Sequence, residues 1–203
     1  MAASVFMIDG NSYIEEKWGD YGHALQHGMA YHSPRIGGVL TLERTGPFIP
    51  PITLPGLGHI VLTSAAREML ESSGLTGFSF RSVEKALTVE LHWEKWDLTT
   101  EDPPYFPDSG EPEDYILGQP NSPSASAALG ELWEVVVPDT ARILHPKPVA
   151  DSYKDLLLDL STWNGTDLFR SDGYSTILFS ERGRAWFTEY WGEHVKFQEF
   201  PST

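Results

Sequence analysis

The chain has 203 residues and a mass of 22.7 kDa, enough for one sizeable hydrophobic core or for two small lobes. Its hydrophobic fraction of 40% and its seven tryptophans exclude an intrinsically disordered chain, because disorder goes with low hydrophobicity and few aromatic residues. Fourteen basic residues stand against 29 acidic ones, and the net charge of −15 repels phosphate backbones and anionic lipids, so direct binding to nucleic acid or to a membrane is not expected.

The N-terminal segment, MAASVFMIDGN, has no basic region and only a short apolar stretch, which is not typical of a signal peptide. No apolar run elsewhere reaches the roughly 18–20 residues that cross a bilayer. The sequence contains no cysteine, so the fold uses neither disulfides nor thiolate metal ligands. These features predict a cytoplasmic protein.

Three histidines near the N-terminus have the spacing of metal ligands. His23 and His27 are four residues apart and would share one face of a helix, with His32 or Asp20 as a third ligand. Glycines and a Ser-Pro pair interrupt a helix in this segment, and no carboxylate stands where the general base of a zinc hydrolase is needed. We therefore expect ordinary histidines, no bound metal and no cofactor.

The first half of the chain predicts several strands and a helix. Residues 39–42 (VLTL) form a strand, and residues 59–83 (HIVLTSAAREMLESSGLTGFSFRSV) predict a short strand, an amphipathic helix and an alternating strand. Ser64 is the expected N-cap of the helix, which Gly74 and Gly77 would end. Residues 87–93 (LTVELHW) alternate and are expected to form a hairpin with residues 78–83.

The segment 98–130 is acidic and rich in proline. Between Lys95 and Arg142 there are ten acidic residues and no basic one, and six prolines exclude a regular element through residues 102–124. Long loops often carry function, and aromatic residues tend to anchor interfaces while charges steer association. The alternative is a solvated linker between two lobes, residues 1–97 and 131–203. The candidate partner-binding residues are Asp102, Tyr105, Phe106, Asp108, Glu111, Glu113, Asp114 and Tyr115.

In the second half, residues 131–137 (ELWEVVV) predict a strand and residues 151–160 (DSYKDLLLDL) a short helix or an apolar strand. Residues 175–200 (STILFSERGRAWFTEYWGEHVKFQEF) repeat the pattern of residues 59–83, with Ser180 as the N-cap. A shift of 116 positions aligns the first strand of one unit with that of the other. One residue inserted after this strand raises the shift to 117 for the helices and the second strands. The alternative is two unrelated units that align by chance.

Strands and helices are mixed without regular alternation, so the sequence predicts an α+β fold in a single domain, residues 1–203. It contains two repeated strand-helix-strand units, additional antiparallel strands and the long acidic loop. Phosphate-loop, GxGxxG, GxSxG and HExxH motifs are absent from the sequence. Neighbouring carboxylates such as Glu113 and Asp114 lie in a segment too polar to bury them, and we therefore do not expect an enzyme.

Two short motifs stand out in the C-terminal third. Asp167-Leu168-Phe169-Arg170 precedes a strand, and Ser180-Glu181-Arg182 opens a helix that leads to a closing strand over residues 195–200. Together they resemble the end of bacterial immunity proteins of polymorphic-toxin systems, in particular the myxobacterial double-CxxCG family, and residues 57–83 resemble the upstream unit of that family. Both CxxCG elements, and the metal-binding feature expected with them, are missing from this chain.

The resemblance implies a protein that inhibits a cognate toxin and protects its producer, and it supplies no catalytic residues. The net negative charge agrees with this function. A toxin that binds phosphate is usually basic, and an acidic inhibitor associates with it faster because of electrostatic steering. We therefore expect an immunity protein that binds a basic toxin domain directly. The alternatives are an acidic scaffold or adaptor module and an enzyme with an unrecognised site; the charge can also serve solubility alone.

Overall fold

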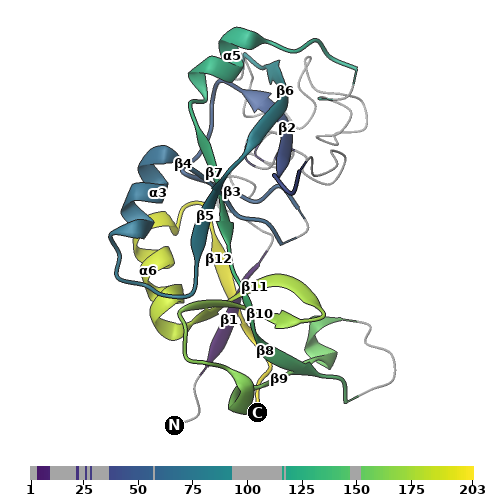
Figure 1. Ribbon diagram of the computed structural model, residues 1–203, viewed down its shortest axis with the longest axis vertical. Helices are drawn as coiled ribbons and strands as arrows, with labels where there is room; N and C mark the ends of the chain where they lie inside the picture. Colours follow the sequence, from purple (N-terminus) through teal and green to yellow (C-terminus); the bar gives the residue numbers. More distant parts are fainter. Residues whose placement is uncertain are drawn as a thin grey trace.

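The computed structural model describes residues 4–9, 22, 26, 28, 37–56, 58–92, 116, 118–146 and 152–203 (Figure 1). Strands predominate over helices in these ranges, and most strand pairs are antiparallel. The expected α+β class is confirmed. No helix in the described ranges is long and apolar enough to span a membrane.

The first strand-helix-strand unit consists of β4 (Val61–Thr63), α3 (Ser64–Glu71) and β5 (Ser79–Ser82). Its two strands do not pair with each other. Both run antiparallel to β7 (Leu132–Val136), which lies between them, and β3 (Ile52–Thr53) pairs with the other side of β4. The order is β3-β4-β7-β5, so β5 forms one edge of this sheet.

The second unit consists of β11 (Tyr174–Ser180), α6 (Glu181–Trp191) and β12 (Lys196–Phe200). Its strands likewise flank a third one, β1 (Val5–Asp9), and run antiparallel to it. The sheet continues with β10 (Leu168–Asp172), which pairs with the other side of β11. The N-terminal strand β1 thus completes a unit whose other elements lie at the C-terminal end of the chain.

Beyond β10 the second sheet adds β8 (Asp139–Leu144), which is parallel to β10, and β9 (Leu157–Asp159). Its order is β12-β1-β11-β10-β8-β9. Residues 151–160, expected to be a helix or a strand, contain a 3-10 turn at Tyr153–Asp155 and then β9; a second 3-10 turn follows at Leu160–Thr162.

The repeat is confirmed and extends further than the sequence pattern indicates. The middle strands correspond in register: Trp133 of β7 lies opposite Leu62, as Phe6 of β1 lies opposite Phe179. On their other side, Trp133 lies opposite Ser82 and Phe6 opposite Glu199. Leu62 and Phe179 differ by 117 positions, as do Ser82 and Glu199. The outer strands also correspond, since Ile52 pairs with Leu62 and Leu168 with Phe179.

One offset of 117 therefore aligns both units throughout, and the expected inserted residue is wrong. The N-cap of α3 is Thr63 and not Ser64: its hydroxyl accepts a hydrogen bond from the amide of Ala66 at 3.3 Å. Ser180 caps α6 as expected and accepts from Gly183 at 3.0 Å. Thr63 can end a strand and cap a helix, because threonine has a β-branched side chain that carries a hydroxyl.

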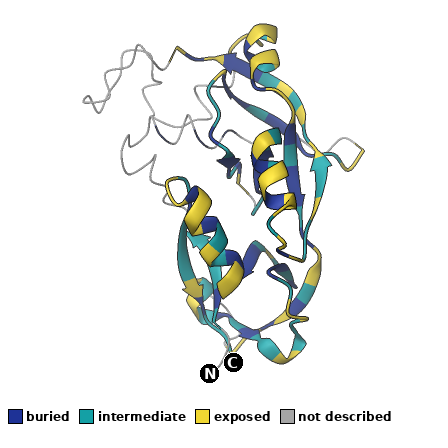
Figure 2. Cartoon of the chain, turned by 90° about the vertical axis from the view of Figure 1, so that its left-hand side faces the viewer, coloured by how far each residue is buried: buried dark blue, intermediate teal, exposed yellow. Residues whose placement is uncertain are grey.

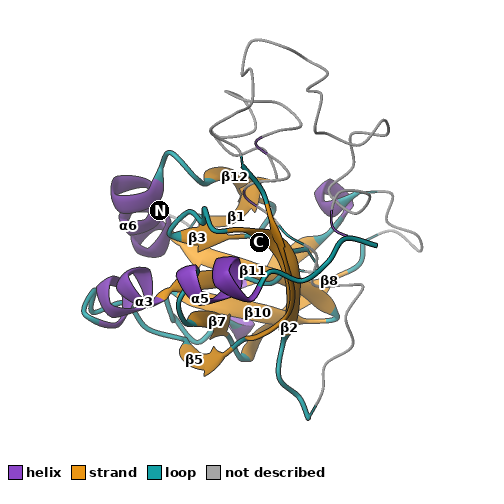
Figure 3. Cartoon of the chain, turned by 90° about the horizontal axis from the view of Figure 1, so that it is seen from above, coloured by secondary structure: helices purple, strands orange, loops and turns teal. Residues whose placement is uncertain are grey.

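The two units share one hydrophobic core, in which residues of both sheets and both helices meet. Helices α3 and α6 lie on the same side of the sheets (Figures 1 and 3). Each turns its buried residues inward and its exposed residues outward (Figure 2). The buried members of this core are Ile52, Ile60, Leu62, Ala66, Leu70, Leu75, Val135, Val137, Leu168, Ile177, Phe179, Phe187, Trp191 and Val195.

The expected hairpin between residues 78–83 and 87–93 is wrong. The chain runs on from β5 into β6 (Glu84–Glu90), which pairs in parallel with β2 (Thr41–Gly46). Residues 78–90 contain no glycine, proline, asparagine or aspartate, so the turn that a hairpin needs has no suitable residue. The small-residue run at the end of the acidic segment forms a short helix, α5 (Pro123–Ala128), which Ser122 caps.

Gly77 offers a test of how closely the two units approach. Its φ is +93°, and a Cβ atom there would lie 2.0 Å from the carbonyl oxygen of Leu168. Gly173 has a similar φ of +78° but nothing within 4 Å. We expect Gly77→Ala to lower the free energy of unfolding by about 3 kcal/mol, and Gly173→Ala by only about 1 kcal/mol. Equal losses in urea unfolding would contradict the close approach.

Candidate functional site

All eight candidate partner-binding residues, from Asp102 to Tyr115, lie outside the described residues, as do His23, His27, His32 and Asp20. The acidic binding segment therefore stays a prediction. Among the residues that the structure describes, no group of three or more histidine, aspartate or glutamate side chains is placed to hold a metal ion.

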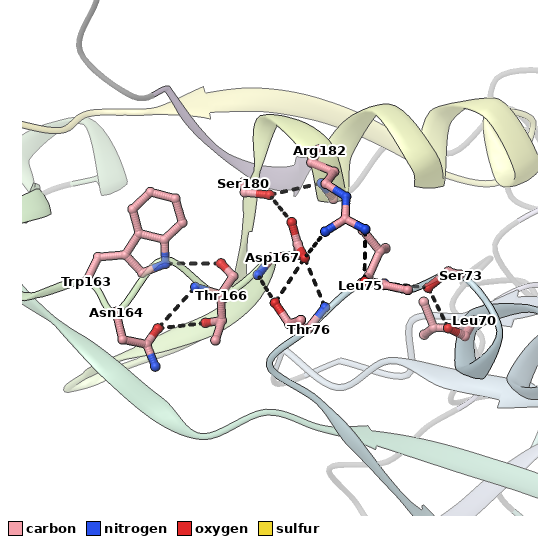
Figure 4. A network of polar contacts seen from close by, with 12 residues as sticks. Leu70, Ser73, Leu75, Thr76, Trp163, Asn164, Thr166, Asp167, Ser180 and Arg182 are labelled. Atoms are coloured by element: carbon pink, nitrogen blue, oxygen red, sulfur yellow. Dashed lines mark hydrogen bonds and ion pairs between the residues drawn. The ribbon is translucent and has the colours of Figure 1, made fainter.

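The two motifs of the C-terminal third meet in a polar network around Asp167 (Figure 4). Asp167 is 5% exposed. One carboxylate oxygen accepts from the hydroxyl of Ser180 at 2.9 Å. The other accepts from the amide of Thr76 at 2.9 Å, from its hydroxyl at 3.0 Å and from Nη1 of Arg182 at 3.2 Å. Both oxygens of this buried carboxylate are therefore hydrogen-bonded.

The network joins the two repeated units. Thr76 lies in the loop between α3 and β5, whereas Ser180 and Arg182 stand at the start of α6. Arg182 also donates to the carbonyl of Gly74 at 2.9 Å, and the backbone of Leu168 donates to that of Thr76 at 3.0 Å. The two motifs thus fix the first unit against the second.

Two other members of these motifs have packing roles. Phe169 is fully buried in a second core cluster, stacked 5.0 Å from the ring of Trp163. Arg170 donates to the carbonyl of Gly58 at 3.0 Å. Gly183, which follows Ser180-Glu181-Arg182, has no room for a side chain, because a Cβ would lie 2.8 Å from the carbonyl oxygen of Asp167.

A second polar cluster lies in the first sheet and was not predicted. Glu134 of β7 is 3% exposed. Arg81 of β5 contacts one of its carboxylate oxygens through Nε at 3.2 Å and Nη2 at 3.1 Å, and Nδ1 of His59 lies 3.2 Å from the other. The remaining Nη1 of Arg81 donates to the carbonyl of Gly38 at 2.8 Å. The sequence feature that could have indicated this cluster is the position of Glu134 within the largely apolar run ELWEVVV.

A third buried ionic group is Arg44 of β2, which is fully buried. It donates to the carbonyl of Thr45 at 2.9 Å and to the hydroxyl of Thr53 at 3.1 Å, so it ties β2 to β3. Loss of hydration by burial lowers the pKa of Arg44 to about 9. These bonds to β2 and β3 indicate a role in the fold.

Each helix places an arginine over the aromatic residue of its middle strand. The guanidinium of Arg67 lies 4.1 Å from the ring centre of Trp133, and that of Arg184 lies 4.8 Å from Phe6. The offset of 117 relates the two arginines. Arg184 also donates to Glu181 through both Nε and Nη2, and these bonds lower the pKa of Glu181 below its ordinary value.

Beside Arg67 the surface is hollowed between α3 and β5. This hollow has a volume of about 440 Å³ and is open to solvent. Its walls combine apolar side chains with one positive and one negative side chain. It is lined by Arg67, Glu71, Leu75, Phe78, Ser79 and Phe80. We call it the α3–β5 groove.

The sequence matches no protein-family model and no curated protein.

The Asp167 network predicts the cost of removing its central residue. Asp167→Ala leaves the buried hydroxyl of Ser180 and the amide of Thr76 without an acceptor, and we expect the free energy of unfolding to fall by about 3 kcal/mol. Arg182→Ala should cost less than about 1 kcal/mol, because that side chain is 61% exposed. Urea unfolding measures both. Similar losses for the two variants would show that Asp167 is not the centre of the network.

His194 predicts a dependence of stability on pH. Burial lowers the pKa of His194 below its ordinary value of 6.5, partly opposed by the charge of Glu193, and its Nδ1 is buried with no hydrogen-bond partner among the described residues. The unfolded chain therefore binds this proton more readily, so stability is lost as the pH falls through about 6.5 and levels off below the lowered pKa.

The urea midpoint should therefore fall less in His194→Gln than in the wild-type protein between about pH 7.5 and pH 5. His145→Gln, at an exposed position, should follow the wild-type protein. Identical pH dependence of the wild-type protein and His194→Gln would contradict this interpretation.

Proposed function

We propose that this chain is an immunity protein that neutralises a cognate bacterial toxin by direct protein–protein binding in the cytoplasm of the producing cell. The observation that carries the proposal is the joining of the two motifs of the resemblance, separated in sequence, in one buried network around Asp167. In this chain the two motifs therefore belong to one tertiary arrangement of side chains.

The polar side chains of the described residues support a binding role over a catalytic one. The carboxylates of Asp167 and Glu134 are buried and bonded to neighbouring side chains, so neither is presented to a substrate. The net charge of −15 suits a basic partner, whose approach it accelerates. A toxin that acts on nucleic acid is such a partner, because it must itself bind phosphate.

The proposal is tested by co-expression with the product of the neighbouring upstream gene, which the proposal requires to be a toxin. We expect the wild-type chain to restore colony counts by at least about a thousandfold, and to leave the toxicity of an unrelated toxin unchanged. Failure to restore growth while the folded chain accumulates would contradict the proposal.

The acidic segment predicts how the partner associates. Neutralising Asp102, Asp108, Glu111, Glu113 and Asp114 together should lower the association rate about tenfold in 50 mM salt, with little change in the dissociation rate. The difference should shrink towards 500 mM salt, because exposed charges are then screened. Surface plasmon resonance measures both rates.

A matched control removes the same charge from exposed positions outside the segment. These positions are Glu84, Asp139, Asp172, Glu189 and Glu193. If this control slows association as much as the first variant, net charge alone steers the partner. If neither variant slows it, the segment is a linker.

A further inference from the structure

The loop before Asp167 contains the one Asn-Gly pair of the sequence, Asn164-Gly165. Both residues are exposed, and a Cβ atom at Gly165, whose φ is +83°, would have nothing within 4 Å. An asparagine that precedes a glycine is prone to react with its own main chain, because the amide nitrogen of the glycine has no Cβ beside it that would hinder its approach to the side chain.

This reaction converts the asparagine into an acid and consumes only water. The backbone nitrogen of Gly165 attacks Cγ of Asn164, the bond from Cγ to the side-chain nitrogen breaks, and ammonia leaves with the proton that the backbone nitrogen gives up. The product is a five-membered succinimide ring. Water then opens the ring at either carbonyl group, which leaves an aspartate or, where the main chain now continues through Cγ, an isoaspartate.

Two hydrogen bonds at Asn164 favour this attack. Its Oδ1 accepts from the hydroxyl of Thr166 at 2.8 Å and from the amide of Thr166 at 3.2 Å (Figure 4). Oδ1 is the atom that gains the negative charge when the nitrogen of Gly165 adds to Cγ. Donors that are already in place at such an oxygen lower the barrier to the reaction.

Both ends of this turn are anchored. Before it, the indole of Trp163 stacks on Phe169 with the ring centres 5.0 Å apart and donates through Nε1 to the carbonyl of Thr166 at 3.1 Å. After it, Thr166 lies against the first unit, because a Cβ atom at Gly77 would be only 2.7 Å from Cβ of Thr166. The donors of Thr166 therefore keep their place beside Oδ1 in the folded chain.

We propose that Asn164 is a modification site, at which the folded protein deamidates itself with the help of Thr166, and that isoaspartate at this position weakens the junction between the two repeated units. Isoaspartate adds one carbon atom to the main chain just before Thr166. Thr166 is followed directly by Asp167, the centre of the network that joins the units. This inference does not rest on the proposed function, because the reaction needs only the chain and water.

The test is incubation of the folded full-length protein for several days at about pH 8 and 37 °C, since the backbone nitrogen of Gly165 must give up its proton. We expect the peptide that contains Asn164 to gain about 1 Da, because OH replaces NH2, and to become a substrate of a protein isoaspartate methyltransferase. Asn121 should keep its mass, because the side chain of Ser122 hinders the same attack. An unchanged mass at Asn164 would overturn the proposal.

Thr166→Val tests the part played by the hydroxyl. Valine keeps the shape and the β-branching of threonine but has no donor, so the loss of ammonia from Asn164 should slow at least about fivefold. Thr166→Ser keeps a hydroxyl and should react within about twofold of the wild-type rate. Equal rates for the wild-type protein and Thr166→Val would contradict the assistance by Thr166.

The turn between β10 and β11 supplies a matched control. Asp172 precedes Gly173, both are exposed, and the φ of Gly173 is +78°. No hydrogen bond to the carboxylate of Asp172 occurs among the described residues. Asp172→Asn therefore creates a second Asn-Gly pair without donors at its side-chain oxygen, and it should lose ammonia at least about fivefold more slowly than Asn164 in the same chain. Loss at position 172 that is as fast as at Asn164 would also contradict the assistance.

Urea unfolding of the isoaspartate fraction, purified by anion-exchange chromatography, tests the effect on the junction. We expect its urea midpoint to lie at least about 0.5 M below that of untreated protein. Asn164→Asp carries the same charge on an unaltered main chain, and its carboxylate still accepts from Thr166, so its midpoint should stay within about 0.2 M of the wild-type value. Equal midpoints for the isoaspartate fraction and Asn164→Asp would show that the modification does not weaken the junction, and would overturn that part of the proposal.

Discussion

A single buried carboxylate, that of Asp167, connects the two halves of this molecule. Its oxygens accept bonds from Thr76 in the first unit and from Ser180 and Arg182 in the second. A buried charge is tolerated only when it is well paired, so each of these donors must be in place together. The close backbone approach at Gly77 follows from the same constraint, because a side chain there would separate the units, and a side chain at Gly183 would push α6 away from the backbone of Asp167.

The fold is a duplication whose two copies are assembled from different parts of the chain. In the first copy the middle strand β7 follows the helix, and in the second the middle strand β1 precedes it by most of the sequence. The pairing partners nevertheless correspond residue by residue, and each helix places an arginine over the aromatic residue of that strand. The copies differ in the length of the helix, because α3 ends three residues earlier than α6.

Local patterns in the sequence predicted several of the elements, but not β1, β3 or β8, and they predicted the pairing of strands poorly. The strand over residues 131–137, the cap at Ser180 and both strand-helix-strand units follow from alternation, capping chemistry and helix stop signals. The insertion of β1 between β11 and β12 has no local signal, because pairing of distant strands depends on the whole core. The α3–β5 groove could not be predicted for the same reason, because its lining residues come together only when α3 packs beside β5.

The position of β1 also bears on the order in which the molecule can assemble. All strands of the first sheet, from β3 to β7, lie in one continuous stretch of chain, so this half can close while synthesis continues. The second half cannot, because β1 must wait unpaired until β11 and β12 emerge, and contacts of such long range form slowly. The half that is ready first is also the half that carries the groove, whereas the bonds from Asp167 to Thr76 form only when the later half docks against it.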